Sequence, residues 1–301
     1  MSNSLNCPTP LSATETDALL IKVKQQIKEK TFDASDVELL QQMVESLGDS
    51  RGMVRLGFAE ALGKVGKPAV PYLLTALTNH ANVVVRRAAA KTLTLIAEPS
   101  TIPTLVQTFL HDEDRVVQSS SVGALARMGE AAVSPLLQIL ADKEAAENAK
   151  GHAAWALAFI SSQAKEQIYQ AYDSDSQEVR SAVVGAVAKI VAEQPEAAGF
   201  EILMNALKDT DVNVRSEAAA VLGNLSYQPA MPILRKLLTH SVPATRKAAA
   251  LAIMKMGDLS SIDLLKTALQ QETEQDSRQA IALAIQLLQK KVEEETDDDW
   301  D

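Results

Sequence analysis

Residues 53–66 read MVRLGFAEALGKVG, residues 178–191 read EVRSAVVGAVAKIV, and residues 213–226 read NVRSEAAAVLGNLS. Five further segments align with these three, at residues 84–97, 116–129, 148–161, 244–257 and 276–289. The third position of every segment carries a long polar side chain: Arg55, Arg86, Gln118, Lys150, Arg180, Arg215, Arg246 and Arg278. Neighbouring members of this series are 30 to 35 residues apart. So regular a period indicates a chain built from internal structural repeats.

Each aligned segment has the apolar spacing of a helix. A small or β-branched residue stands four positions after the third residue, and a large aliphatic residue stands seven positions after it: Leu62, Leu93, Leu125, Leu157, Val187, Leu222, Ile253 and Ile285. Offsets of four and seven fall on one side of a helix with 3.6 residues per turn. We therefore expect each segment to be the second helix of a helical hairpin.

The first helices of the hairpins lie between these segments. Four of them contain a proline followed two residues later by a leucine: Pro71, Pro103, Pro135 and Pro232. Proline is tolerated in the first turn of a helix, where its missing N–H has no helical partner. These prolines therefore predict where the first helices begin.

The predicted fold is all-α, a curved α-solenoid of about eight helical hairpins over residues 36–290, with its concave surface lined by the second helices. Residues 1–35 form an N-terminal segment with a capping helix, in which Ser12 and Glu15 have the spacing of a capping box. Residues 291–301 are too acidic to pack, so we expect a disordered tail.

An acidic residue often precedes the second helix of a hairpin: Asp49, Asp112, Asp142, Asp173 and Asp209. An arginine at one position in successive stacked hairpins can bond to such an aspartate, or to the turn carbonyls of its neighbour. We therefore interpret the repeated arginines as a structural ladder through the array rather than as a row that binds a ligand: Arg55, Arg86, Arg180, Arg215, Arg246 and Arg278.

Composition excludes several classes of function. The formal net charge is −10, and seven acidic residues lie in the last nine positions, so the rest of the chain is close to neutral. This balance lacks the basic footprint of a nucleic-acid-binding protein. The single cysteine, Cys7, excludes an intrachain disulfide and a cysteine-rich metal site. With no membrane-spanning run and no signal peptide, a cytoplasmic protein is expected.

The sequence offers little for catalysis. Three of the four histidines, His80, His111 and His240, fall in the turns of the predicted hairpins, and no pair of histidines has metal-ligand spacing on one helix. Glycine-rich phosphate loops and nucleophile elbows are also absent. We therefore expect no metal and no catalytic residues of the chain's own.

The repeat pattern resembles the phycobilisome-lyase type of HEAT repeat. The resemblance rests on the period near 31, on first helices with a Pro-x-Leu-Leu pattern, and on second helices such as VRRAAAKTL, and it covers residues from about 36 to 290. Members of this group include bilin lyase subunits, phycobilisome-degradation proteins and an IscA-interacting HEAT-repeat protein of cyanobacteria. Deoxyhypusine hydroxylase has similar repeats, but its iron-binding His-Glu dipeptide does not occur in this chain.

The resemblance leaves two functions open. The first is a non-catalytic scaffold that binds proteins, associated with the phycobilisome and without a cofactor. The alternative is a subunit or chaperone of a bilin lyase, which would hold an open-chain tetrapyrrole and deliver it to a cysteine of a phycobiliprotein. The resemblance implies a phycobiliprotein or a second HEAT-repeat chain as partner. A third, weaker hypothesis is that the chain is a cluster-assembly partner that uses Cys7.

Two places are candidate binding sites. Trp155 is the only large aromatic residue five positions after the repeated polar residue, and glycines Gly123 and Gly185 occupy that position in the neighbouring repeats. With His152 one turn earlier, Trp155 predicts a shallow aromatic groove, unless the indole simply packs over the two glycines. Trp300, surrounded by acids, predicts a short docking peptide, unless the tail only solvates the chain.

Overall fold

The computed structural model describes residues 11–298, and within that range the chain forms helices joined by short turns, without a β-strand. The α-helices are α1 (Ala13–Glu29), α2 (Val37–Glu45), α3 (Gly52–Val65), α4 (Val70–Asn79), α5 (Val83–Ile96), α6 (Ile102–His111), α7 (Arg115–Arg127), α8 (Glu130–Ala141), α9 (Glu147–Ile160), α10 (Lys165–Gln170), α11 (Gln177–Glu193), α12 (Ala197–Ala206), α13 (Val212–Asn224), α14 (Met231–Leu237), α15 (Pro243–Met256), α16 (Ile262–Gln271) and α17 (Gln275–Asp298). The predicted all-α solenoid is confirmed.

The helices alternate along the chain as the repeat predicts. Even-numbered helices from α2 to α16 are the first helices of hairpins, and odd-numbered helices from α3 to α17 are the second, which makes eight hairpins within the described range. Helix α1 stands outside this alternation. By their internal contacts the hairpins divide into two compact units. The first runs to Ile139 and includes Glu144–Ala156, and the second comprises Leu140–Lys143 and the chain from Leu157 on.

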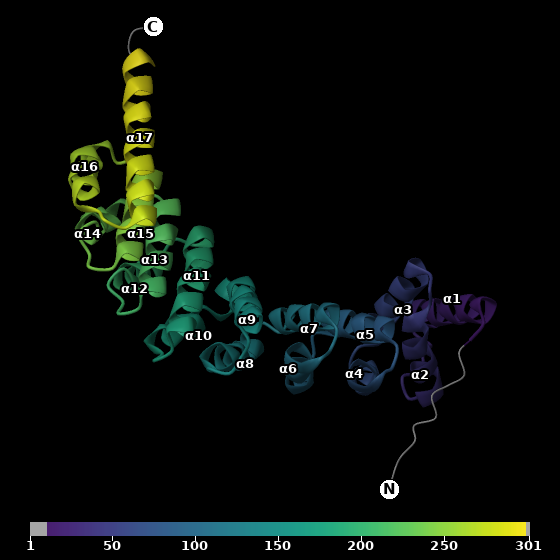
Figure 1. The fold of residues 1–301 in the computed structure, drawn as a ribbon. Coiled ribbons are helices and arrows are strands. Elements are labelled where there is room, and N and C mark those ends of the chain that lie inside the picture. Colours follow the sequence, from purple (N-terminus) through teal and green to yellow (C-terminus); the bar gives the residue numbers. More distant parts are fainter. Residues whose placement is uncertain (1–10, 299–301) are drawn as a thin grey trace. The chain divides into compact units, whose positions relative to one another are not determined.

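In the first unit the second helices form one layer and the first helices another. Figure 1 shows α3, α5 and α7 following one another, with α2, α4 and α6 beside them. The large aliphatic residues of the repeat, Leu62, Leu93 and Leu125, are fully buried between the layers. Burying a leucine side chain contributes about 2 kcal/mol. The repeated leucine therefore explains why each hairpin stacks on the next.

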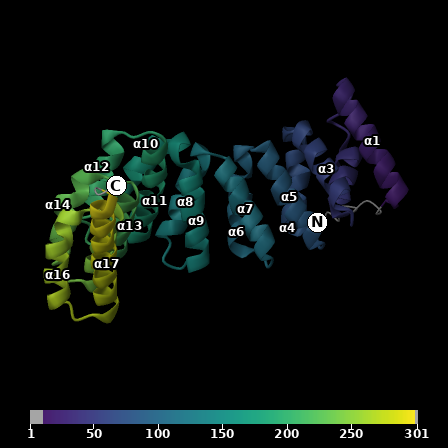
Figure 2. The ribbon, with the colours of Figure 1, turned by 90° about the horizontal axis from the view of Figure 1, so that it is seen from above.

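Helix α1 covers the open side of the first hairpin. Its capping box is confirmed: the Ser12 side chain accepts from the N–H of Glu15, and a Glu15 carboxylate oxygen accepts from the N–H of Ser12 at 2.8 Å. Val23 is fully buried, and Leu20 lies so near Gly57 that a Cβ on that glycine would be 2.9 Å from it. Leu20 therefore packs directly over Gly57, and α1 lies against α3, as Figure 2 shows.

The second unit repeats this packing among α11, α13, α15 and α17. Its buried stripe consists of Val187, Leu222, Ile253 and Ile285. Helices α13 and α15 approach so closely that a Cβ on Gly223 would lie 2.9 Å from the Cα of Ala252. Small side chains at this contact therefore set the spacing of the two helices.

Prolines mark the beginnings of three first helices, as predicted. Pro71, Pro103 and Pro232 lie in the first turn of α4, α6 and α14, each after a short 3₁₀ turn. The prediction is wrong for Pro135, which lies inside α8, because that helix begins at Glu130. In α8 the introductory turn, closed by the Ala132 N–H donating to the Gly129 carbonyl, is part of the α-helix itself.

Each repeated arginine closes the turn of its own hairpin. The Nη1 group of Arg86 donates to the carbonyl of His80, six residues earlier, at 3.1 Å, and that of Arg215 donates to the carbonyl of Asp209 at 2.7 Å. The same bond to the carbonyl six positions back is made by four further arginines: Arg55, Arg180, Arg246 and Arg278. Turn carbonyls that the helix cannot satisfy are thereby paired.

The other side of the guanidinium reaches the next hairpin. Nε of Arg86 donates to Asp112 at 3.1 Å, Nε of Arg180 donates to Asp209 at 2.8 Å, and Nε of Arg246 donates to Glu272 at 2.7 Å. Each of these carboxylates also accepts the main-chain N–H two residues after it. One carboxylate therefore orders its own turn and ties it to the preceding hairpin.

Histidine takes the place of the acid in two hairpins. Nδ1 of His80 and of His240 accepts the N–H two residues later, at 3.0 Å in both turns. Burial, with Arg215 and Arg246 nearby, lowers the pKa of His240. Since His240 offers no carboxylate, Arg215 donates instead to the Thr245 hydroxyl, at 3.1 and 3.2 Å.

Asp142 and Asp173 do not hold the turn position that the sequence analysis gives them. Counting six residues back from Lys150 and Arg180 places Glu144 and Ser174 there. The Ser174 hydroxyl accepts the N–H of Ser176 at 3.2 Å, as the acids do in other turns. Both aspartates lie one or two residues earlier, because the turns of these hairpins are shifted relative to the others.

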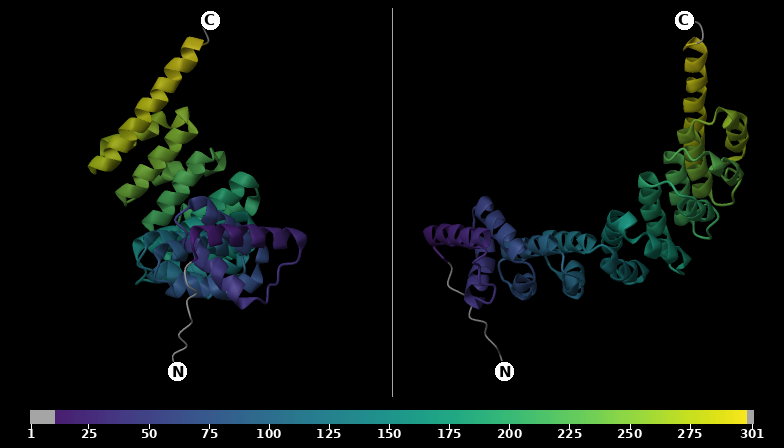
Figure 3. Two further views of the ribbon diagram at one scale, coloured as in Figure 1. Left: turned by 90° about the vertical axis from the view of Figure 1, so that its right-hand side faces the viewer. Right: turned by 180° about the vertical axis from the view of Figure 1, so that it is seen from behind.

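Helix α17 runs past residue 290, where the sequence analysis begins a disordered tail, and ends at Asp298. Figure 3 shows it extending beyond α15. The side chains of 291–294 are exposed, and Lys290 lies 3.4 Å from Glu294 one turn later. Spacing of this kind stabilises an exposed stretch of helix. Cys7 and Trp300 lie outside the described residues.

The ladder between hairpins predicts a stability effect at Asp209, whose side chain is 6% exposed. Asp209→Asn leaves the Arg180 guanidinium without its charged acceptor, and should lower the free energy of unfolding by about 3 kcal/mol. The matched control is Asp263→Asn, in an exposed pair with Lys266, which should change it by less than about 0.5 kcal/mol. Thermal unfolding followed by circular dichroism measures both, and equal effects would contradict the ladder.

A second prediction concerns pH. Arg246 lowers the pKa of Glu272 from 4.5 to about 2, helped by hydrogen bonds from Ser277 and from the N–H of Glu274, and opposed by burial. Because the folded pKa lies below the unfolded one, this stabilisation is complete above about pH 5 and disappears as the pH falls toward 2. Glu272→Gln should therefore be less stable than the native chain by about 3 kcal/mol at pH 7, and the difference should close by pH 2. A difference that stays constant across that range would show that Glu272 acts without its charge.

Candidate functional site

Helix α9 presents an aromatic face to solvent. Trp155 is 52% exposed and Phe159, one turn later, is 47% exposed, and the smaller Gly151 and His152 are exposed on the preceding turn. The opposite face is fully buried through Ala153, Ala156, Leu157 and Ile160. Exposed apolar side chains that lie next to one another can mark an interaction site. This aromatic face, defined by His152, Trp155 and Phe159, is the first candidate site.

The glycines of the predicted groove leave open space. A Cβ built on Gly123 or on Gly151 would have no described heavy atom within 4 Å, and one on Gly185 would meet only a Glu217 carboxylate oxygen at 3.9 Å. The indole of Trp155 therefore does not rest on the Cα of Gly123. Gly123 and Gly185 belong to different compact units, and the groove that they would share with Trp155 stays a prediction.

His152 has a second contact that the sequence does not reveal. Its ring meets Phe109 of α6 edge to face, with ring centroids 6.1 Å apart and planes at 84°. Phe109 is buried. This pairing orients the imidazole at the start of the aromatic face, so His152 serves both the packing of α9 on α6 and the exposed surface.

Phe159 is the member of the aromatic face that the sequence analysis does not place in the site. It follows Trp155 by four residues, which puts the two side chains next to each other on one side of a helix. The same register position, nine after the repeated polar residue, carries Lys64, Leu95, Arg127 and Lys189 elsewhere. That comparison could have identified Phe159, because no other repeat has an aromatic residue there.

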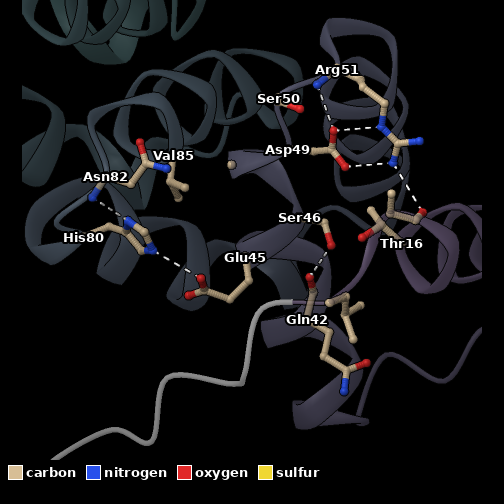
Figure 4. A pocket seen from close by; sticks show the side chains of 13 residues that line it. Thr16, Gln42, Glu45, Ser46, Asp49, Ser50, Arg51, His80, Asn82 and Val85 are labelled. Atoms are coloured by element: carbon tan, nitrogen blue, oxygen red, sulfur yellow. Dashed lines mark hydrogen bonds and ion pairs between the residues drawn. The ribbon is translucent and has the colours of Figure 1, made fainter.

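A polar cavity of about 570 Å³ is the second candidate, at the turns of the first two hairpins. Figure 4 shows the His80 ring beside the Glu45 carboxylate and Arg51 bonded to Asp49. Nε2 of His80 lies 3.2 Å from the Glu45 carboxylate, and Nη1 of Arg51 also donates to Asp17 of α1 at 2.8 Å. Each of these charged groups is bonded to another lining residue or to its own turn. The cavity therefore displays the turn chemistry described above and holds no polar group aimed at a ligand.

Among residues 11–298, no group of three or more His, Cys, Asp or Glu side chains is placed to hold a metal ion. None of the helices in that range is both long and apolar enough to cross a bilayer. What the α9 surface can do is bind: flat aromatic side chains, with an imidazole beside them, suit a planar conjugated ligand or an apolar patch on a protein.

The aromatic face predicts an asymmetry between two residues of α9. Trp155→Ala removes a half-exposed side chain and should lower the free energy of unfolding by less than about 1 kcal/mol. Leu157→Ala, two residues later and fully buried, should cost about 2–5 kcal/mol. Melting temperatures of the two variants measure this. If Trp155→Ala were as destabilising as Leu157→Ala, the indole would be a packing residue and the site would lie elsewhere.

Comparison with known proteins agrees with the fold. A family model described as HEAT repeats matches residues 70–158 and 200–286. The chain is 38% identical over 281 residues to the bilin biosynthesis protein MpeU of Synechococcus sp. (strain WH8020), covering 93% of this chain and 95% of that one.

Two solved structures are similar to the chain at lower sequence identity. A Kap121p mutant matches 96% of this chain over 38% of its own length, with a TM-score of 0.57 and 13% identity. The complex of CpcE and CpcF of phycocyanin lyase from Nostoc sp. PCC7120 matches 83% of this chain and 94% of that one, with a TM-score of 0.33 and 19% identity. At such identities a structural likeness concerns the fold alone.

Proposed function

Because the chain belongs to the HEAT-repeat proteins of the bilin-lyase type, we propose that it binds an open-chain tetrapyrrole and takes part in attaching it to a phycobiliprotein, as a lyase subunit or a lyase chaperone. The observation that carries this proposal is the 38% identity with a bilin biosynthesis protein over nearly the full length of both chains. The scaffold function that the sequence analysis puts first receives less support, because the relative is named for bilin chemistry.

The aromatic face of α9 is the surface we assign to the bilin. A bilin is a chain of four conjugated pyrrole rings, and a flat π-system of this kind stacks favourably on an exposed indole or phenyl ring. Trp155 and Phe159 would hold two positions along the ligand, one helical turn apart. His152, fixed by Phe109, would offer a ring nitrogen to the polar edge of the pyrroles.

Holding the bilin is also what this surface would contribute to attachment of the bilin to the phycobiliprotein. Addition of a cysteine thiol across a carbon–carbon double bond of the bilin forms one C–S bond and moves the thiol proton to the neighbouring carbon. The step is redox-neutral and needs no metal ion. The chain would hold the bilin in one conformation and present the reacting carbon to the acceptor's thiol, which lowers the entropic part of the barrier.

The partner is a protein under this proposal. A bilin held on a solvent-facing helix can be reached by a second macromolecule, which a closed pocket would prevent. We propose the phycobiliprotein that accepts the bilin as this partner, and a second HEAT-repeat chain as the other member of the lyase. Neither partnership depends on a catalytic group in this chain.

Co-expression with a bilin-producing pathway tests the function. The purified native protein should carry visible absorbance from bound bilin, and the double variant Trp155→Ala with Phe159→Ala should retain about tenfold less. Leu283→Ala is the matched control, since Leu283 is 44% exposed at the same register as Trp155. A colourless native protein would favour the scaffold function. Equal colour in the native protein and the double variant would place the bilin away from α9.

A further inference from the structure

One face of the first unit is basic, although the chain as a whole has a formal net charge of −10. It consists of five exposed cations on four helices: Lys24 and Lys28 on α1, Lys64 on α3, Lys91 on α5 and Arg127 on α7. We call these five cations the basic face. Within residues 11–298 no ion pair involves any of the five, whereas the exposed Lys67 lies 3.0 Å from Glu98.

Register places these cations on one side of the first unit. The three lysines of α1 and α3 line a single cavity of about 540 Å³, together with the exposed Glu60. Lys91 has the register position of Glu60 one repeat later, and Arg127 has that of Lys64 two repeats later. Helices α1, α3, α5 and α7 contact one another in this order, as Figure 2 shows. The cations therefore form a stripe across consecutive hairpins.

The length of the stripe indicates the size of an occupant. Packed helices lie about 8–10 Å apart, so four consecutive helices span roughly 24–30 Å. An extended chain covers this distance with about eight or nine residues. Lys24 and Lys28 are one helical turn apart, a spacing at which like charges repel, and an acidic occupant would relieve that repulsion. A short, extended and acidic segment therefore fits the basic face in both length and charge.

The basic face also offers an apolar contact near its middle. Leu95 of α5 is 57% exposed and stands at the register position that Lys64 and Arg127 hold in the repeats on either side. Apolar side chains of α1 and α3, Ile27 and Ala61, line the cavity between the lysines. An occupant with an apolar side chain between its acidic ones would therefore bury that side chain on Leu95.

We propose that the basic face binds an extended acidic segment of a partner protein, with an apolar side chain near the middle of that segment. A nucleic acid or an anionic membrane extends well beyond roughly 30 Å, and the net negative charge of the chain would repel it. A short segment meets the cations alone. The proposal uses neither the aromatic face of α9 nor the bilin function.

A labelled peptide tests the binding. The probe is the fluorescent peptide EEDELEDEE, titrated with the full-length native protein. Fluorescence anisotropy should show saturable binding at low salt that weakens about tenfold at high salt, because exposed charges are screened. Absence of saturable binding at low salt would overturn the proposal.

Two matched triple variants test where the peptide binds. Together, Lys28→Glu, Lys64→Glu and Lys91→Glu should abolish binding. The control changes the net charge equally at three exposed lysines of the second unit, and should retain most of the binding: Lys143→Glu, Lys208→Glu and Lys236→Glu. Glutamine at the three positions of the basic face removes the charges without adding acids, and should still weaken binding at least tenfold. An equal loss in the two glutamate triples would refute the proposed location.

The apolar contact is tested by a second peptide, EEDESEDEE, in which serine replaces the leucine. The native protein should bind it several-fold more weakly than the first peptide. Leu95→Ser should remove this difference, because both peptides then lack the same contact. The matched control is Leu287→Ser, at the same register in the last repeat and 44% exposed, which should preserve the difference. Equal binding of the two peptides to the native protein would contradict the apolar contact.

Two further measurements exclude other occupants of the basic face. The native protein should not float with phosphatidylserine vesicles, and sedimentation should show no self-association that the glutamate triple of the basic face abolishes. Vesicle binding that this triple abolishes would make a membrane the occupant. Self-association with the same dependence would make a second copy of the chain the occupant. Either result would overturn the proposal.

Discussion

The hydrogen bonds that a repeated arginine makes to its own turn and to the turn of the next hairpin hold the stack of hairpins together. A guanidinium has donors on several sides, so Arg180 can donate to the carbonyl of Ser174 in its own turn and to Asp209 in the next one. The same carboxylate of Asp209 accepts the N–H of Asp211, which fixes where α13 begins. Stacking of hairpins and the direction of each second helix are therefore set together, and the buried aliphatic stripe then fills the space between them.

This arrangement leaves the outer positions of the second helices free for the binding role that we propose for them. The residues at offsets four and seven are buried in the core, and the arginine side chain bonds to the turn. The residues five and nine positions after the arginine remain in solvent, where they can vary without disturbing the stack. Trp155 and Phe159 occupy these two positions in one repeat, and Lys91 and Arg127 occupy them in others. One scaffold can thus present an aromatic face in one place and a charged face in another.

The fold can be predicted from the sequence alone because every repeat has the same spacing of polar and apolar residues. The period, the buried leucines, the capping box at Ser12 and the first-turn positions of Pro71, Pro103 and Pro232 are local features, and the structure bears them out. The predicted start of α8 at Pro135 and the predicted turn residues before Glu144 and Ser174 are wrong. One or two extra residues move a turn along the chain without altering the period of the repeat. Contacts between hairpins, such as His152 on Phe109, depend on packing 43 residues apart in sequence and leave no local signal.

We propose that the α9 surface binds a bilin, and the chain contains an internal fluorescent probe for this binding. Its two tryptophans are Trp155 and Trp300, so Trp300→Phe leaves Trp155 as the sole tryptophan. Titration of this variant with biliverdin, an open-chain tetrapyrrole, should quench the Trp155 fluorescence saturably at stoichiometric ligand. Phe159→Ala in the same background should weaken the quenching about tenfold. Fluorescence that stays unchanged while biliverdin binds by its own absorbance would place the ligand elsewhere, and absence of any binding would contradict the claim itself.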